Sequence, residues 1–322
     1  MFRKLLLALL IVPLLAACGP ARTSTPAAVA TEPPASAVPS ITSIPPITLT
    51  DGLNRTVTLE GPAQRVVSLA PSNTEILFAI GAGAQVVGRD ETSDYPAEAL
   101  TLPTIGGYSG FNQEAIVALH PDLVLAGGIN SPELVASLEQ LGLRVYFLPN
   151  PTTLEEMYTN LETVARLTGH ETETAGLVES LKERVAAVDE KILPISSRPT
   201  VFYELDATTD PTKPYTAGPG SFVDLLIARA GGINVGANLH SQWPQISLEQ
   251  LVVANPTIIL LGDAAYGETP EKVAQRSGWG TLAAVQTAQV FPFDDNLVSR
   301  PGPRLVDGLE ALARLLHPGA FK

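Results

Sequence analysis

The sequence predicts an α/β protein built from two similar lobes, and three observations support that fold class. The same pattern of apolar and polar residues occurs at 111–126 (FNQEAIVALHPDLVLA) and at 246–261 (ISLEQLVVANPTIILL), without a gap. Apolar strand-like runs alternate with helix-like segments through both halves of the chain. A long amphipathic segment lies between the two halves. Two lobes joined by one long helix would hold a ligand cleft between them.

Each copy of the repeated pattern predicts a helix, a turn and a buried strand. Asn112 and Ser247 are placed to cap the helices, because their side-chain oxygens can accept from the free amides of the first turn. Ser247 and Gln250 also fit a capping box. Pro121 and Pro256 cannot continue a helix. The runs that follow, DLVLA and TIILL, lack polar alternation and suit strands buried on both faces.

A second pair of segments repeats a strand followed by a helix. RVVSLAPSNTEILFAIGAG predicts a strand, a capping box from Ser72 to Glu75, and a helix that ends at Gly81. In the same order, VFYEL predicts a strand, Ser221 to Asp224 a capping box, and FVDLLIARA a helix. One repeated pair of segments can arise by chance in any α/β protein. Two repeated pairs in the same order along the chain favour two similar lobes.

The N-terminus carries targeting information. Arg3 and Lys4 precede an apolar run too short to span a bilayer, so residues 1–17 are predicted to be a secretory signal peptide. The only cysteine, Cys18, follows small residues in LAAC, a stretch that resembles a lipobox, in which the thiol receives a lipid anchor. Residues 18–46 are then the lipidated cysteine and a proline-rich tether that cannot bury a core.

The folded body is predicted to begin at residue 47. The N-terminal lobe spans 47–150 and opens with a hairpin that turns at Asp51 and Gly52. Residues 151–198 form a helical segment, and the C-terminal lobe spans 199–322. The remaining elements expected are strands at 65–69, 85–88, 122–125 and 144–147, an inter-lobe helix at 172–192, and a last helix at 303–316.

Composition argues against several functions. The net charge is −13 and no Lys/Arg cluster is present, so nucleic acid is not an expected partner. The histidines lack metal-ligand spacing, so no metal site is predicted, and each is expected at the surface. GYSG is not a nucleophile elbow, because its second glycine directly follows the serine. GAGAQVVG follows a predicted helix and leads into a strand, which is the reverse of the order in a dinucleotide-binding fingerprint. We therefore predict no enzyme, with a secreted α/β hydrolase as a remote alternative. The histidines are His120, His170, His240 and His317.

Loops that follow the predicted strands carry aromatic and polar residues. Ligands of α/β proteins bind beyond the carboxyl ends of the strands. Tyr108, Tyr215, Trp243 and the stretch DDNLVSRPGPR fall in such loops. Each aromatic ring could instead cover an edge of the core. As a set, these residues predict a site for a flat, partly apolar ligand.

Several motifs carry a resemblance to a known family. RVVSLAPSNTEILFAIGAGAQVVG, SDYP, FNQEAIVALHPDLVLA, WPQISLEQL and SRPGPRLVDGLEAL resemble the substrate-binding proteins of ABC importers for cobalamin, haem and iron-siderophores. The resemblance covers about residues 47–318 and implies two α/β lobes joined by a rigid helix. It also implies a monomeric, extracytoplasmic receptor, anchored on the outer face of the cytoplasmic membrane, that serves a permease dimer with its ATPase subunits.

Within this family, WPQIS and SDYP are most similar to the vitamin B12 binders. The resemblance implies a cobalt corrinoid as the transported ligand, with an iron-siderophore or haem as the alternative, and no intrinsic cofactor. Tyr108, Thr92 and Asn296 stand where a B12 binder has Trp, Tyr and Asp. In B12 members, glutamates at the positions of Glu114 and Glu249 dock onto permease arginines. The ligand contacts implied are Ser72, Asn73, Thr92, Tyr108, Tyr215, Trp243, Asn296 and Arg300.

Overall fold

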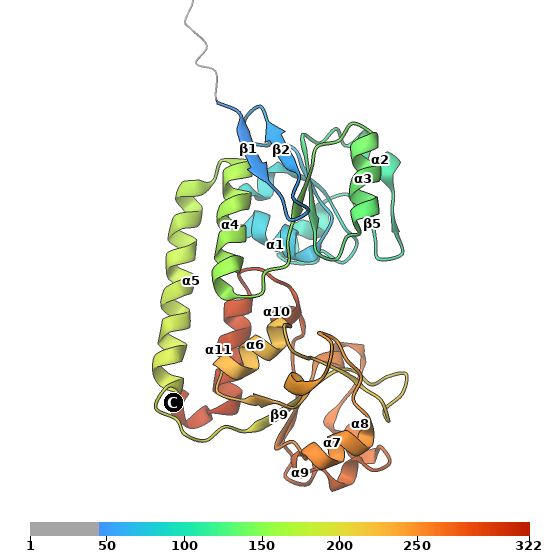
Figure 1. Cartoon of the computed structure of the whole chain (residues 1–322), viewed down its shortest axis with the longest axis vertical. Coiled ribbons are helices and arrows are strands. Elements are labelled where there is room, and N and C mark those ends of the chain that lie inside the picture. Colours follow the sequence, from blue (N-terminus) through green and yellow to red (C-terminus); the bar gives the residue numbers. More distant parts are fainter. Residues whose placement is uncertain (1–44) are drawn as a thin grey trace, which may run out of the picture. The chain divides into compact units, whose positions relative to one another are not determined.

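The predicted hairpin is present at the start of the described chain. The structure, a computed structural model, describes residues 45–322 (Figure 1). Strands β1 (Ile47–Thr50) and β2 (Thr56–Leu59) pair antiparallel, and the Asp51 carboxylate accepts from the amides of the turn between them. The predicted signal peptide, Cys18 and most of the tether lie outside the described residues.

The N-terminal lobe is a parallel sheet with helices, as the apolar runs predicted. Its strand order is β4-β3-β7-β8, and the candidate ligand residues Ser72 and Asn73 lie in the helix that follows β3. The small hairpin β5–β6 carries Tyr108 at its tip. The elements are β3 (Val66–Ser68), α1 (Pro71–Ala79), β4 (Val86–Arg89), β5 (Gly106–Gly107), β6 (Gly110–Phe111), α2 (Gln113–Ala118), β7 (Leu123–Gly127), α3 (Pro132–Gln140) and β8 (Val145–Leu148).

The C-terminal lobe repeats this topology. Strand β9 lies between the parallel strands β11 and β12, and β13 follows β12, just as β3 lies between β4 and β7 and β8 follows β7. The short β10 adds to β9 antiparallel. The elements are β9 (Thr200–Asp206), β10 (Tyr215–Thr216), α6 (Phe222–Arg229), β11 (Ile233–Asn234), α7 (Leu248–Ala254), β12 (Ile258–Leu261), α8 (Pro270–Gln275), α9 (Ala283–Gln286), β13 (Val290–Pro292), α10 (Asn296–Ser299) and α11 (Leu305–Leu316).

The two copies of the repeated pattern fold alike. They form α2 with β7 and α7 with β12, and Asn112 and Ser247 cap the two helices as predicted. The Ser247–Gln250 capping box is present. The residues before the two prolines, His120 and Asn255, both take the left-handed backbone conformation, with φ of 46° and 42°. The same left-handed residue therefore separates each helix from its proline, although α7 runs one residue further than α2.

The predicted inter-lobe helix is confirmed as α5 (Glu171–Ile192), which follows α4 (Leu154–Thr168) after a break at Gly169. Its buried residues include Val178, Leu181 and Val185, spaced on one face, and it packs against α4 and α11. Figure 1 shows α5 extending alongside both lobes. One continuous apolar cluster includes side chains of both sheets and of α5, so the junction of the lobes is a packed interior.

Three local predictions were wrong. Helix α1 is capped at Ala70 without a side-chain bond, because Pro71 occupies its first turn and Glu75 pairs with two arginines instead of closing a box with Ser72. Ser221 does cap α6, but the Asp224 carboxylate accepts from Asn234 instead of closing the box.

The third is the surface position expected for His317. Its side chain is buried and its ring nitrogen Nε2 lies 3.2 Å from the Gly231 carbonyl oxygen. The chain after α11 packs back against the turn that ends α6, and this tertiary contact covers the ring.

Candidate ligand-binding cleft

Three candidate aromatic side chains are exposed on loops of the two lobes. Tyr108, at the tip of the β5–β6 hairpin, is 103% exposed. In the C-terminal lobe, Tyr215 is 43% and Trp243 is 40% exposed. An antiparallel bridge joins Tyr215 to Gln245, which brings the Trp243 loop beside β10. The Tyr108 ring is thus fully open to a ligand, and Tyr215 and Trp243 each expose part of their side chains.

The polar candidates lie in different environments. Ser72 is half-buried in the first turn of α1, and Thr92 is exposed and donates its hydroxyl to the Asp90 carboxylate at 2.5 Å. Asn296 begins α10 and is half-buried. Asn73 is buried, and its amide donates to the Leu125 carbonyl at 3.1 Å, which joins α1 to β7. Asn73 is therefore engaged within the N-terminal lobe and is not exposed to a ligand in this structure.

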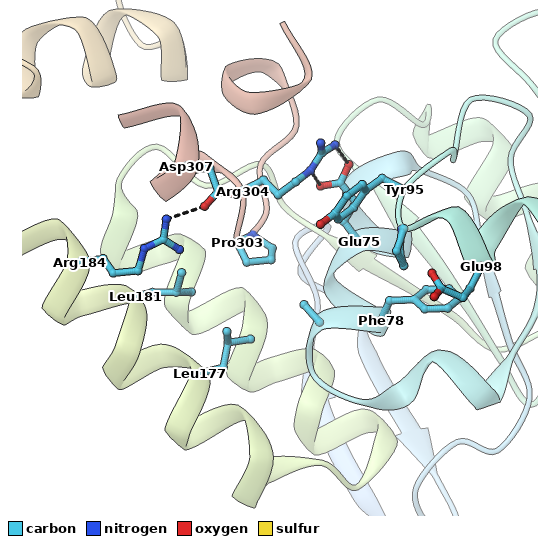
Figure 2. A pocket seen from close by; sticks show the side chains of 12 residues that line it. Glu75, Phe78, Tyr95, Glu98, Leu177, Leu181, Arg184, Pro303, Arg304 and Asp307 are labelled. Carbon is cyan, nitrogen blue, oxygen red and sulfur yellow. Dashed lines mark hydrogen bonds and ion pairs between the residues drawn. The ribbon is translucent and has the colours of Figure 1, made fainter. Parts of the chain in front are cut away.

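Arg300 reaches from the C-terminal lobe to the N-terminal lobe. Its Nη1 donates to Glu75 Oε1 at 3.0 Å and to Asp94 Oδ1 at 2.6 Å, and its Nη2 donates to the Thr92 carbonyl at 3.3 Å. Arg304 also binds Glu75, with Nε to Oε2 at 2.8 Å and a second bond from Nη2. Figure 2 shows the Glu75 carboxylate facing Arg304. We call Glu75, Asp94, Arg300 and Arg304 the inter-lobe ion cluster.

Burial and pairing act in opposite directions on the charges of this cluster. Burial disfavours the charged guanidinium of Arg300, but its hydrogen bonds to Asp94 and Glu75 outweigh that effect and raise its pKa. Burial likewise disfavours the Asp94 carboxylate, and the bond from Arg300 more than compensates and lowers its pKa. Pairing therefore favours the charged forms of Arg300 and Asp94. The cluster as a whole contains two acidic and two basic side chains.

A cavity of about 550 Å³ lies beside the cluster at the junction of the lobes (Figure 2). Its apolar walls include Phe78 of α1 and Leu177 and Leu181 of α5. The Arg304 guanidinium stacks over the Tyr95 ring, 4.0 Å from its centroid. This cavity opens next to α5, whereas Tyr108, Tyr215 and Trp243 are not among its lining residues.

The sequence reasoning missed Asp94, Tyr95 and Arg304 as parts of this site and assigned Glu75 to a helix cap. A signal was present in the quoted motifs, because SDYP and SRPGPR contain an acid and two arginines that had no local partner. Their partners lie on the other lobe, more than 200 positions away.

The two predicted docking residues are exposed in equivalent positions. Glu114 lies in the first turn of α2 and Glu249 in the first turn of α7. Within residues 45–322, neither carboxylate forms an ion pair. Each stands beside an exposed valine of the same helix, Val117 or Val252. The two lobes thus present the same small surface.

The architecture is that of a two-lobed binding protein. Two α/β lobes of like topology share a packed junction, and exposed rings occupy loops of both. In the described part of the chain no group of acidic, His or Cys side chains could hold a metal ion, and no helix is long and apolar enough to cross a membrane.

Comparison with known proteins gives the family. A family model described as periplasmic binding protein matches residues 66–297, and the chain belongs to this family. It is therefore a substrate-binding protein and not an enzyme. An ABC transporter substrate-binding lipoprotein of Bacillus subtilis is 32% identical over 86% of this chain and 87% of its own length. A cobalamin-binding protein of Halobacterium salinarum is 31% identical over 92% of this chain and 81% of its own.

Solved structures agree with the two-lobed fold. The vitamin B12 binding protein of Vibrio cholerae aligns with a TM-score of 0.68 at 29% identity, covering 81% of this chain and 99% of that one. The haem-binding protein of Roseiflexus in its apo form aligns with a TM-score of 0.72 at 28% identity, covering 80% and 99%. The predicted fold class is confirmed.

Proposed function

We propose that this protein is the lipid-anchored, extracytoplasmic receptor of an ABC importer, and that it captures a corrinoid between its lobes. The observation that carries the ligand class is the set of exposed rings, Tyr108 on one lobe and Tyr215 and Trp243 on the other. A corrin is a broad, largely apolar ring with polar groups at its edge, so it can bury such rings while Arg300 and Thr92 supply polar contacts.

The comparisons support a corrinoid as the first candidate and name two further ligand classes. The relatives from Halobacterium and Vibrio are named for cobalamin or vitamin B12, and each is about as similar to this chain as the Bacillus lipoprotein. Haem is the second candidate, favoured by the structural similarity to the Roseiflexus haem-binding protein. An iron-siderophore is a further alternative, since an Fe³⁺-hydroxamate transport protein has a similar fold.

The partner in this proposal is a permease dimer with its ATPase subunits. Glu114 and Glu249 occupy equivalent exposed positions on two similar lobes, which suits a partner that is itself two-fold symmetric. Charged groups at the rim of such a contact guide association and fix its register. The alternative is that both acids only stabilise their helices, because a negative charge at a helix N-terminus contributes about 0.3–1 kcal/mol.

Attachment to the membrane rests on Cys18 in LAAC and on the tether that follows it. The Bacillus relative is named a lipoprotein, which supports the same assignment here. A proline-rich chain extends about 3 Å per residue, so the tether would let the folded body reach a permease from its anchor.

Transport in proteoliposomes that contain the importer served by this receptor tests the docking surface. We expect Glu114→Ala and Glu249→Ala each to reduce uptake at limiting receptor concentration, and the double variant to reduce it further. Ligand affinity should be unchanged. Glu133 and Glu271 provide matched controls, since they are exposed glutamates in the first turns of α3 and α8, one on each lobe.

If only a helix-stabilising role is involved, the control variants Glu133→Ala and Glu271→Ala will behave like the docking variants. Uptake by the Glu114→Ala/Glu249→Ala variant at the wild-type rate would contradict the docking role.

A further inference from the structure

Arg300 is the one positively charged residue among the candidate ligand contacts, and it is already paired within the protein. Its Nη1 is shared between Glu75 and Asp94, and its Nη2 faces the Thr92 carbonyl. Arg304 next to it is held by both oxygens of Glu75. The two guanidinium groups of the inter-lobe ion cluster are thus matched by its two carboxylates, and the cluster offers a ligand no excess positive charge.

The two acids that bind Arg300 differ in how firmly they are fixed. The Glu75 side chain is 1% exposed and binds both arginines, so it holds Arg300 from the buried side. The Asp94 side chain is 56% exposed and lies on the loop after β4. Ion pairs open to solvent contribute little stability, so a ligand loses little by displacing one. A ligand approaching Arg300 from solvent therefore meets the Asp94–Arg300 pair and competes with Asp94, while Glu75 keeps the guanidinium in place.

This pair distinguishes carboxamides from carboxylates. A carboxamide carries an acceptor and a donor, so its oxygen can accept from Arg300 while its NH₂ donates to Asp94. A carboxylate has acceptors only, so it can bind Arg300 but is repelled by Asp94. Two like charges a few ångströms apart near the protein surface repel each other, although water screens part of that repulsion.

We propose that Asp94 is a specificity-determining residue, which admits ligands with amide groups at this edge of the cleft and discriminates against ligands with carboxylates there. The inference rests on the proposed function, because it assumes that the ligand reaches Arg300. It also separates the two leading candidates: the edge of cobalamin carries carboxamides, whereas haem carries two propionates.

The test uses matched ligands that differ by one group. Cyanocobalamin and its monocarboxylic acids, in which one propionamide is hydrolysed to a carboxylate, have nearly the same shape. We expect wild-type protein to bind the acid whose carboxylate faces Arg300 about three- to thirtyfold more weakly than cyanocobalamin. Asp94→Asn should reduce that ratio several-fold. The Glu98→Gln variant removes an equal charge four residues further along the chain, in the 3-10 helix Ala97–Thr101. It should leave the ratio unchanged, because Glu98 has no ion pair within residues 45–322.

The outcomes separate the two proposals. If cyanocobalamin binds but Asp94→Asn leaves every ratio unchanged, or if Glu98→Gln changes the ratio equally, the role of Asp94 is overturned while the corrinoid receptor stands. If the wild type binds no corrinoid, the proposed function fails. The inference is then tested with haem, for which Asp94→Asn should raise the affinity several-fold over wild type and Glu98→Gln should not. An unchanged haem affinity would overturn it.

Discussion

Replacing Glu75 by Gln should weaken the junction of the lobes more than any other single change in the inter-lobe ion cluster. The substitution keeps the size of the side chain but removes the charge that binds Arg300 and Arg304, and it leaves at least one guanidinium N–H facing an NH₂ group that is itself a donor. Breaking a buried ion pair by neutralising one partner costs about 3–5 kcal/mol when the remaining charge is fully enclosed.

The expected cost for Glu75→Gln is smaller, because both guanidiniums keep some contact with solvent. Their side chains are 13% and 12% exposed, and Arg300 retains Asp94 and the Thr92 carbonyl. We expect a loss of about 2–4 kcal/mol in the free energy of unfolding. For a folded body of this size that corresponds to a fall in melting temperature of roughly 3–7 °C.

Urea and thermal denaturation of residues 45–322, followed by circular dichroism, measure this effect. Glu98→Gln is the matched control and should change the free energy of unfolding by less than about 0.5 kcal/mol. A Glu75→Gln variant as stable as this control would refute the reasoning, since it would mean that the buried carboxylate does not stabilise the junction.

Three further changes have defined outcomes. Trp243→Ala should weaken corrinoid binding by about 1–3 kcal/mol in a fluorescence or calorimetric titration, with an unchanged melting temperature; normal affinity with lowered stability would make Trp243 a packing residue instead. Burial raises the pKa of Glu204 to about 7 despite its bond to Arg276. Because this folded-state pKa lies above the unfolded value of about 4.3, Glu204 makes the protein less stable as pH rises from about 4.5 to 7. Glu204→Gln should flatten that part of the stability profile in urea denaturation, and an identical slope would contradict the assignment. Cys18→Ser should move the protein from the membrane to the soluble fraction of cells, and full retention of the variant on membranes would argue against a lipid anchor at Cys18.

The fold could be predicted from the sequence because its elements depend on local patterns. The run LVLAG of β7 contains no polar residue, and the spacing of Val178, Leu181 and Val185 defines one face of α5. The repeated segments added long-range information, since two copies of one pattern implied two lobes of like topology.

The ion cluster could not be predicted in this way. The letters S-x-x-E fit a helix cap at Ser72 and Glu75, and nothing near them in the sequence indicates that Glu75 pairs with Arg300, 225 positions later. Burial of His317 was missed for the same reason, because the turn that covers it belongs to a distant segment. Contacts between distant elements depend on tertiary packing. The local sequence pattern around a residue carries no information about which distant residue it will contact.

The most direct test of the proposed function is a calorimetric titration of residues 45–322 with cyanocobalamin, haem and ferric siderophores under the same conditions. The proposal predicts saturable binding of one cyanocobalamin per protein molecule, at lower ligand concentration than for haem or any siderophore. Stoichiometric binding of haem or a ferric siderophore, with no detectable binding of cyanocobalamin, would contradict it.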